Sequence, residues 1–248
     1  MSGPVVMSGR PGGTTARSVE VLAGLPDEFR LIGGLAVLCR VGVPHRATVD
    51  LDALDSYDVA LRSVALSAAG GGQYLMAGRL ELDVIDVGES DADDLVEHLL
   101  AAGEPITDLE LNAVAHTWAH DVATLLDLLV VSDVDGTVLA AAADRLVASP
   151  GGLVAMKATT VPLRASSKPE KRASDLYDLG RLLTSTVGWA AELAGAPAPL
   201  RDVVRDRVRF WFTDPTGTDR TFRDTRRFDE VRLDLDDVAD AVDEAWPA

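Results

Sequence analysis

Residues 46–54, RATVDLDAL, are the segment that most restricts how this chain can fold. Side chains alternate between the two faces of a β-strand, so Thr48, Asp50 and Asp52 would share one face while apolar residues occupy the other. Aspartate is disfavoured in strands, and two carboxylates on one face therefore need a physical reason. The segment is either a solvent-exposed edge strand or a platform for divalent cations.

A metal platform would suit this pair of carboxylates. Mg²⁺ prefers hard oxygen ligands and usually takes only one or two carboxylates together with substrate phosphates. Residues two apart on a strand lie ~7 Å apart, and such a pair can hold two ions for phosphoryl or nucleotidyl transfer. The later segment 79–87 also predicts a strand, on which Glu81 and Asp83 share a face. We expect Asp83, in the middle of that strand, to be the third carboxylate, with Glu81 as the alternative.

A pair of glycines precedes the carboxylate strand in the segment LIGGLAVL, residues 31–38. The pattern predicts a short strand, then Gly33 and Gly34, and then a helix. Glycine permits a close approach of the backbone to a ligand, and the N-terminus of a helix offers unpaired N–H groups to phosphate. The segment therefore favours a phosphate site beside the carboxylates.

A second block of the chain combines cations and acids on predicted helices. Lys157 and Arg164 are seven residues apart and so lie on one helix face, although Pro162 can kink the helix between them. Such cations can bind a triphosphate. Asp175 and Asp178 lie together beside a stripe of leucines on the next helix. The alternatives are an ordinary surface lysine and an acid that stabilises the start of a helix.

Short apolar segments with glycine-rich turns dominate the first part of the chain, and helical patterns dominate from the Ser149-Pro150 helix start onward. The sequence thus predicts an α+β fold, with a small mixed sheet flanked by helices and followed by a helical C-terminal domain. Residues 1–17 are rich in Gly, Ser and Pro, and we expect a disordered leader there. The expected strands cover residues 28–32, 46–54, 73–77, 79–87, 125–131 and 137–141, and the expected helices before residue 149 cover 18–25, 33–40, 56–69, 91–102 and 108–120.

The two blocks, taken in order, resemble a known family. The glycine pair followed by R-x-T-x-D-x-D resembles the signature of polymerase-β-type nucleotidyltransferases, and the second block is similar to the AbiEii-like and MenT-like toxin branch of that superfamily. Many polymerase-β-type enzymes have Gly-Ser where this chain has Gly-Gly, although the AbiEii branch tolerates this difference. The resemblance spans about residues 31–184. The matching residues are Gly33, Gly34, Arg46, Thr48, Asp50 and Asp52 in the first block, and Lys157, Arg164, Asp175 and Asp178 in the second.

The resemblance implies a Mg²⁺-dependent nucleotidyltransferase that moves a nucleoside monophosphate from an NTP to an RNA hydroxyl. The 3′ end of tRNA is the candidate acceptor, and the enzyme would be a toxin controlled by an antitoxin protein. Residues 18–148 would form the nucleotidyltransferase core, and residues 149–248 a helical domain that contributes to the active-site cleft. The implied catalytic residues are Asp50, Asp52, Lys157 and Asp175; the ligands of two Mg²⁺ ions are Asp50, Asp52 and Asp83; and the nucleotide-binding residues are Gly33, Gly34, Arg46, Thr48, Lys157, Arg164 and Asp178.

A rival motif lies in LLVVSDVDGTVL, residues 128–139. An apolar strand followed by D-x-D-G-T resembles the first motif of haloacid-dehalogenase-type phosphatases, with Asp133 as nucleophile and Asp135 as general acid and base. Ser149 and Lys157 follow in the order that this family requires. They are only eight residues apart, however, too close for the crossover of a dozen or more residues that joins parallel strands. We therefore interpret the motif as a hairpin turn.

The charge of the chain restricts its partners. A net charge of −17 gives no long-range attraction to nucleic acid, so RNA would have to be bound by a local surface. The segment Arg201–Arg232 interleaves nine arginines with aromatic residues, and it could hold an RNA end or form an ion-paired helix. A small-molecule acceptor, as in antibiotic-type nucleotidyltransferases, is the other alternative. A single cysteine, and no apolar run near the ~20 residues of a membrane span, favour a cytoplasmic protein without a membrane segment.

Overall fold

The structure is a computed structural model that describes residues 3–42, 45, 51–55, 61, 65–164, 168–228 and 231–247. Its contacts divide the chain into two compact units. The first unit contains residues 1–89 and 122–148, and the second contains residues 90–121 and 149–248. The chain therefore passes between the two units more than once.

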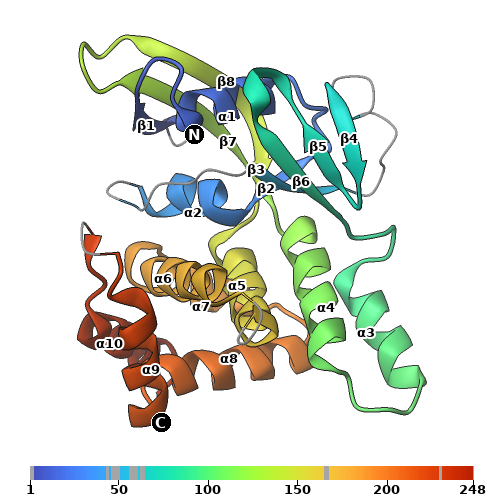
Figure 1. The fold of residues 1–248 in the computed structure, drawn as a ribbon. Helices are drawn as coiled ribbons and strands as arrows, with labels where there is room; N and C mark the ends of the chain where they lie inside the picture. The colour runs from blue at the N-terminus through green and yellow to red at the C-terminus, as the bar shows by residue number, and fades with distance from the viewer. Residues whose placement is uncertain are drawn as a thin grey trace. The chain divides into compact units, whose positions relative to one another are not determined.

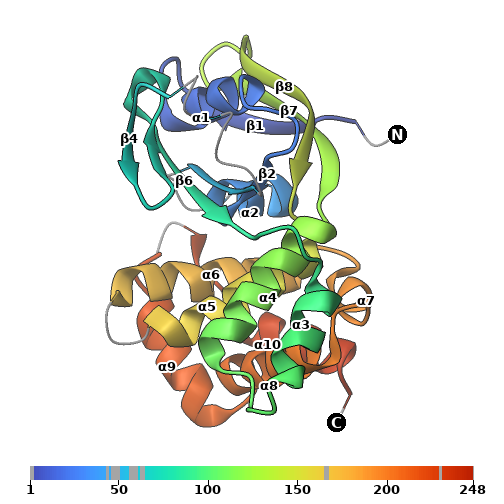
Figure 2. The ribbon, with the colours of Figure 1, turned by 90° about the vertical axis from the view of Figure 1, so that its right-hand side faces the viewer.

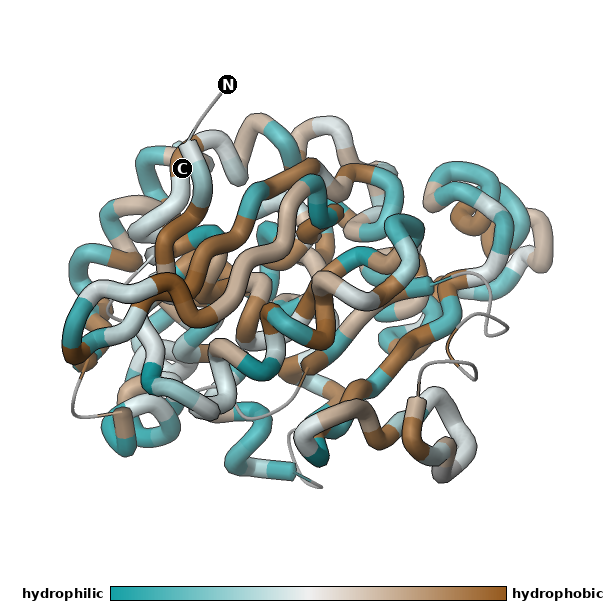
Figure 3. Tube along the Cα trace, turned by 90° about the horizontal axis from the view of Figure 1, so that it is seen from above, coloured by the Kyte–Doolittle hydropathy of each residue, from teal (hydrophilic) through white to brown (hydrophobic). Residues whose placement is uncertain are grey.

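The first unit is built on a mixed sheet of eight strands in the order β1-β7-β8-β2-β3-β6-β5-β4 (Figure 1). This confirms the predicted α+β class. Hydrophobic segments run along the strands, and hydrophilic ones gather in the loops (Figure 3). The helix α1 packs mainly on β8, and α2 packs on β2 and β3. The elements are β1 (Val5–Gly9), α1 (Thr14–Ala23), β2 (Arg30–Ile32), α2 (Gly33–Val41), β3 (Leu51–Asp55), β4 (Ser67–Gly70), β5 (Gln73–Leu75), a 3₁₀ turn (Ala77–Arg79), β6 (Glu81–Asp86), β7 (Thr124–Ser132) and β8 (Val138–Val147).

Strand β3 lies between an antiparallel and a parallel neighbour. Asp52 is opposite Ile32 at the end of β2, and opposite Asp83 on β6. Because β3 and β6 run parallel and in register, Asp52 and Asp83 point to the same face of the sheet. Leu51 and Ala53 point to the other face and are completely buried. The predicted alternation of the carboxylate strand is thus confirmed over its described residues.

The predicted disordered leader over residues 1–17 is wrong for residues 5–9 and 14–17, which form a strand and the start of a helix. Val5–Gly9 forms the edge strand β1, which pairs in parallel with β7. The reason is hydrophobic burial: Met7 is only 1% exposed, and its sulfur lies 3.9 Å from that of Cys39. Because Gly, Ser and Pro flank only three apolar residues, the local sequence indicates disorder. The strand forms by pairing with a distant segment, which the local sequence does not show.

The predicted helix over residues 56–69 is also wrong at its end. Residues 67–70 form β4, which a glycine-rich turn joins to β5 as an antiparallel hairpin. The turn requires glycine at residue 72, where φ is +81°. The rest of the predicted helix lies largely outside the described residues.

The rival phosphatase motif lies in a β-hairpin. β7 and β8 pair in antiparallel fashion, and residues 133–137 join them. The carboxylate of Asp135 accepts hydrogen bonds from the backbone N–H of Thr137 at 3.2 Å and from its hydroxyl at 2.8 Å, while Asp133 pairs with Arg10 at 3.2 Å. The predicted turn is confirmed. Because β7 and β8 are antiparallel, the motif is not followed by the parallel crossover that the phosphatase fold requires.

The second unit is helical. Both Figure 1 and Figure 2 show α5 between α4 and α6, and α5 packs on both. The sequence predicts that the stretch 90–121 belongs to the first part, but it groups with the C-terminal helices because α4 lies along α5. Among the described residues, no helix has the length and apolar character needed to cross a bilayer. The helices are α3 (Ala92–Ala101), α4 (Asp108–Asp121), α5 (Pro150–Arg164), α6 (Pro169–Ser185), α7 (Trp189–Leu193), α8 (Ala198–Phe212), α9 (Pro215–Thr225) and α10 (Leu235–Ala245).

A glycine allows α9 to approach α8 closely. Asp214 caps α9 by accepting hydrogen bonds from the backbone N–H groups of Thr216 and Gly217. A Cβ added to Gly217 would lie 2.6 Å from the carbonyl carbon of Phe210 and closer still to its oxygen. Because both neighbours are backbone atoms, they cannot give way as a flexible side chain would.

We expect Gly217→Ala to lower the free energy of unfolding by about 2 kcal/mol, because overpacking costs about 3 kcal/mol and helix propensity returns about 1 kcal/mol. Gly24→Ala is the control, since its nearest neighbour would be the carbonyl oxygen of Val21 at 3.5 Å. Its effect should stay within about 0.5 kcal/mol. Urea unfolding measures both variants, and equal stabilities would contradict the close packing of α9 on α8.

Candidate active site

The carboxylate of Asp52 lies against the backbone of Gly33. β2 runs directly into α2, and Gly33 is the first residue of that helix, with a φ of +69°. A Cβ added to Gly33 would lie 2.8 Å from Cγ of Asp52 and closer still to its oxygen Oδ2. The backbone conformation and the lack of space both require glycine here. Two of the predicted site residues are therefore brought into direct contact.

The helix α2 receives no cap from the side chain of its own N-cap residue. Its N-cap residue is Ile32, which offers no oxygen, and no acidic residue lies in the first turn. The first N–H groups of an α-helix have no intrahelical partner and carry a partial positive charge. Gly34, the second residue of the helix, is buried. This helix start therefore suits an anionic group, and it lies where the Asp52 carboxylate points.

Asp83 lies on the neighbouring strand, on the same face as Asp52. Adjacent strands are ~4.8 Å apart, so the two carboxylates are within reach of one cation. Asp83 is half-buried, whereas Glu81, two residues earlier, is exposed. The register and burial favour Asp83 over Glu81 as the carboxylate that accompanies Asp52.

Arg46, Thr48 and Asp50 lie outside the described residues, and so their predicted roles stay predictions. Within the described ranges, no group of three or more His, Cys, Asp or Glu side chains could hold a metal ion. Asp50 lies outside those ranges, and Asp52 and Asp83 are two of the three predicted ligands. Their hard oxygen atoms, which lie on one face of two neighbouring strands, fit a divalent cation such as Mg²⁺.

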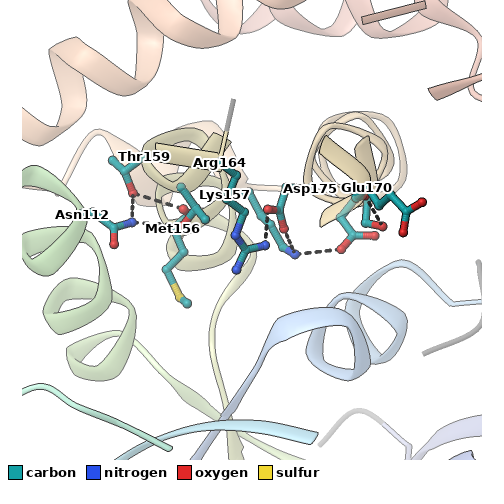
Figure 4. Close-up of polar contacts among 10 residues, drawn as sticks. Asn112, Met156, Lys157, Thr159, Arg164, Glu170 and Asp175 are labelled. Atoms are coloured by element: carbon teal, nitrogen blue, oxygen red, sulfur yellow. Dashed lines mark hydrogen bonds and ion pairs between the residues drawn. The ribbon is translucent and has the colours of Figure 1, made fainter. Parts of the chain in front are cut away.

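A second group of predicted residues meets in the helical unit (Figure 4). Nζ of Lys157 donates hydrogen bonds to Asp175 at 2.7 Å and to Asp178 at 2.8 Å. Arg164, in the last turn of α5, pairs with the other oxygen of Asp175. Lys157 and Arg164 therefore share a helix face as predicted, and Pro162 does not interrupt α5.

Both structural alternatives for this cluster are wrong. Lys157 is only 8% exposed, so it is not a surface lysine. Asp175 lies in the second turn of α6 and is 2% exposed, so it is not an acid at a helix start. Burial alone would lower the pKa of Lys157, but the carboxylates of Asp175 and Asp178 outweigh burial and raise that pKa above its ordinary value. The lysine is therefore a cation at neutral pH.

The sequence reasoning missed the contribution of α4. Nδ2 of Asn112 donates hydrogen bonds to the hydroxyls of Thr159 and Thr160, both at 3.0 Å (Figure 4). Asn112 thereby fixes α4 to the helix that carries the lysine. In the sequence, the only indication of this contact is an asparagine within the predicted helix 108–120.

His116 lies one turn after Asn112 and is buried. Its Nδ1 lies 2.6 Å from the carbonyl oxygen of Asn112, to which it donates as the neutral tautomer. Burial has the largest effect and lowers the pKa of His116. The carbonyl of Asn112 and the carboxylate of Asp175 oppose this effect, whereas Arg164 and Lys157 add to it, so the pKa of His116 lies below its ordinary value. The cluster is thus bordered by an uncharged imidazole rather than by a third cation.

We expect Lys157→Met to lower the free energy of unfolding by about 3–5 kcal/mol, because it leaves two buried carboxylates with only Arg164 as a cation. A second substitution, Asp178→Asn, restores electrical neutrality and should recover a large part of that loss. Urea unfolding of the single and double variants measures the difference. If the double variant were less stable than the single one, the charge balance described here would be wrong.

A family model identifies the family of this chain. A family model described as the nucleotidyl transferase AbiEii toxin of a type IV toxin–antitoxin system matches residues 18–243. Among solved structures, the chain is similar to an antigenic nucleotidyltransferase-like protein from Paracoccidioides brasiliensis, with 18% identity, coverage of 85% of this chain and 92% of that chain, and a TM-score of 0.44. A comparison with curated proteins found no match. Because the family model spans most of the sequence, this chain belongs to the AbiEii family of nucleotidyltransferase toxins.

Proposed function

We propose that this nucleotidyltransferase moves a nucleoside monophosphate from an NTP to a hydroxyl of RNA with the help of Mg²⁺. The 3′ end of tRNA is the first acceptor to test. The observation that carries the proposal is the contact between Asp52 and Gly33, which brings a carboxylate to the start of a helix. An antibiotic-type small molecule is the alternative acceptor.

The charges at this helix start support a role for a cation. A carboxylate and a triphosphate beside the same N–H groups would repel each other unless a cation lay between them. Asp52 and Asp83 would hold that cation, and Asp50 would complete the set. When bound, Mg²⁺ would polarise the α-phosphate and stabilise the charge that develops during transfer.

The remaining residues of the first unit would bind and orient the reactants. The N–H groups at Gly33 and Gly34 would donate hydrogen bonds to the β- and γ-phosphates. Arg46 would offset their charge, and Thr48 would line the nucleotide pocket. Asp83 would take the proton of the attacking hydroxyl, and pyrophosphate would leave.

In the second unit, Lys157 and Arg164 would bind phosphate groups of the nucleotide. An ammonium group has three donors, and the two hydrogen bonds to carboxylates leave one donor for a phosphate oxygen. Asp175 and Asp178 would hold the ammonium group in place, and in this way both would contribute to catalysis and nucleotide binding. The raised pKa of Lys157 keeps it charged for this task.

The family also implies an antitoxin partner. We propose that the antitoxin restrains nucleotidyl transfer, since unrestrained modification of RNA would stop growth. NTPs and RNA meet in the cytoplasm, which is the proposed place of action.

We expect Asp52→Asn to reduce the labelling of total tRNA by α-³²P-labelled NTPs and Mg²⁺ about a thousandfold, because a metal ligand is lost. Gly33→Ala should cause a similar loss, since the new Cβ would displace the Asp52 carboxylate. Asp50→Ala should behave in the same way. Without Mg²⁺, the thermal stability of Asp52→Asn should hold or rise, because repulsion between carboxylates is relieved.

The controls separate this site from its alternatives. Glu81→Gln should keep most of the activity, because Asp83 and not Glu81 is the proposed ligand. Asp133→Asn and Asp135→Asn should also stay active, since both residues lie at a hairpin turn. Labelling at a near wild-type rate by Asp52→Asn would rule out the proposed metal site.

A further inference from the structure

The arginine-rich segment 201–232 separates into two sets in the structure. The arginines of α8 are engaged with acids of the same unit, so α8 is the ion-paired helix that the sequence allowed as an alternative. These pairs are Arg201–Asp202 at 3.8 Å, Arg205–Asp202 at 3.6 Å, Arg207–Asp108 at 2.6 Å and Arg209–Asp243 at 3.3 Å. Each of these four arginines thus has a carboxylate partner within 4 Å.

A second set of four arginines gathers on α9 and the turn after it. Arg220, Arg223 and Arg227 recur at the i, i+3, i+7 spacing of one helix face. Arg226 is the C-cap residue, retains helical geometry with a φ of −56°, and lies beside them. All four are exposed, while α9 packs through other residues on α6 and α8 (Figures 1 and 2). We name this surface the α9 arginine face.

Ion pairs engage only two of the four arginines of the α9 arginine face, among the described residues. Arg220 and Arg226 form no ion pair with any residue in the described part of the chain. Arg223 pairs with Asp219 at 2.7 Å, and Arg227 pairs with a glutamate of α6 at 3.9 Å. Surface pairs of this kind are worth at most ~1 kcal/mol, so a phosphate can replace the carboxylate. In a chain with a net charge of −17, this face is a local cationic surface.

An aromatic ring borders the α9 arginine face. Phe222 is 43% exposed, and the guanidinium of Arg232 lies 5.7 Å from its centroid. A cavity of about 940 Å³ adjoins the ring and is lined in part by Asp219, Asp234 and Asp236. The carboxylates disfavour a phosphate inside the cavity. A nucleobase, in contrast, can stack on the ring and donate from its amino groups to the carboxylates.

We propose that the α9 arginine face and Phe222 bind the single-stranded end of an RNA acceptor. The inference rests on the proposed function, because it names the surface that holds the acceptor of that reaction. Phosphates contact the arginines, and one base stacks on Phe222. A membrane surface fits less well, since a helix that lies on lipid presents a row of apolar residues rather than one ring.

The test compares two double variants of the full chain that remove equal charge. Arg220→Ala/Arg226→Ala changes the α9 arginine face, and Arg201→Ala/Arg205→Ala changes the ion-paired helix. With a short fluorescent single-stranded RNA, the first should lose affinity about tenfold and reduce the slope of log affinity against log salt by about 1.4, that is about 0.7 per phosphate contact. The second should change affinity less than about twofold.

A substitution of the ring tests the stacking contact. Phe222→Ala should weaken RNA binding by about fivefold or more, whereas Phe222→Trp should retain it. Binding of a fluorescent NTP analogue with Mg²⁺ should be unchanged in every variant, which distinguishes a failure of this inference from a failure of the proposed function.

Three results would overturn the inference. The first is an equal loss of RNA affinity in both double variants, which would show a general effect of charge. The second is wild-type protein that does not bind RNA, even if it transfers nucleotides to another acceptor. The third is a loss of binding to phosphatidylserine vesicles in Arg220→Ala/Arg226→Ala while RNA binding stays intact.

Discussion

The space at Gly33, which the carboxylate of Asp52 fills, is the constraint on which the first unit depends. β2 has to end where α2 begins, and the antiparallel register with β3 then places Asp52 opposite Ile32. The parallel strand β6 brings Asp83 to the same face. A shift of register by one residue would turn the carboxylate strand over, burying acids and exposing leucine. The register of β3 and the start of α2 thus meet at one contact, which is also the centre of the candidate active site.

The second unit is organised around buried charge. Taking an ammonium group and two carboxylates out of water costs several kcal/mol per ion, and apolar residues of similar volume often pack as well or better. Lys157 nevertheless occupies the middle of α5, the helix that most others in the unit contact. A core selected for stability alone would avoid this cost, which supports a role for the cluster in binding phosphate. The neutral state of His116 limits the positive charge there to the lysine and Arg164.

Much of the fold could be predicted because the signals are local. The hairpin at residues 133–137 and the helix after the two glycines follow from turn chemistry and hydrophobic periodicity. β1 could not be predicted, since its partner β7 lies more than a hundred residues later. The sequence placed Lys157 and Asp175 on helix faces, but only packing brings them together. The contribution of Asn112 from α4 depends on packing in the same way.

Crystallography with Mn²⁺ and a non-hydrolysable NTP tests whether Asp52 and Asp83 hold a divalent cation for nucleotidyl transfer. Anomalous scattering locates manganese without reference to any assumed ligand. We expect an anomalous peak at coordination distance from carboxylate oxygens of both residues and from a phosphate oxygen of the nucleotide. A well-ordered nucleotide with manganese bound away from both aspartates would contradict it.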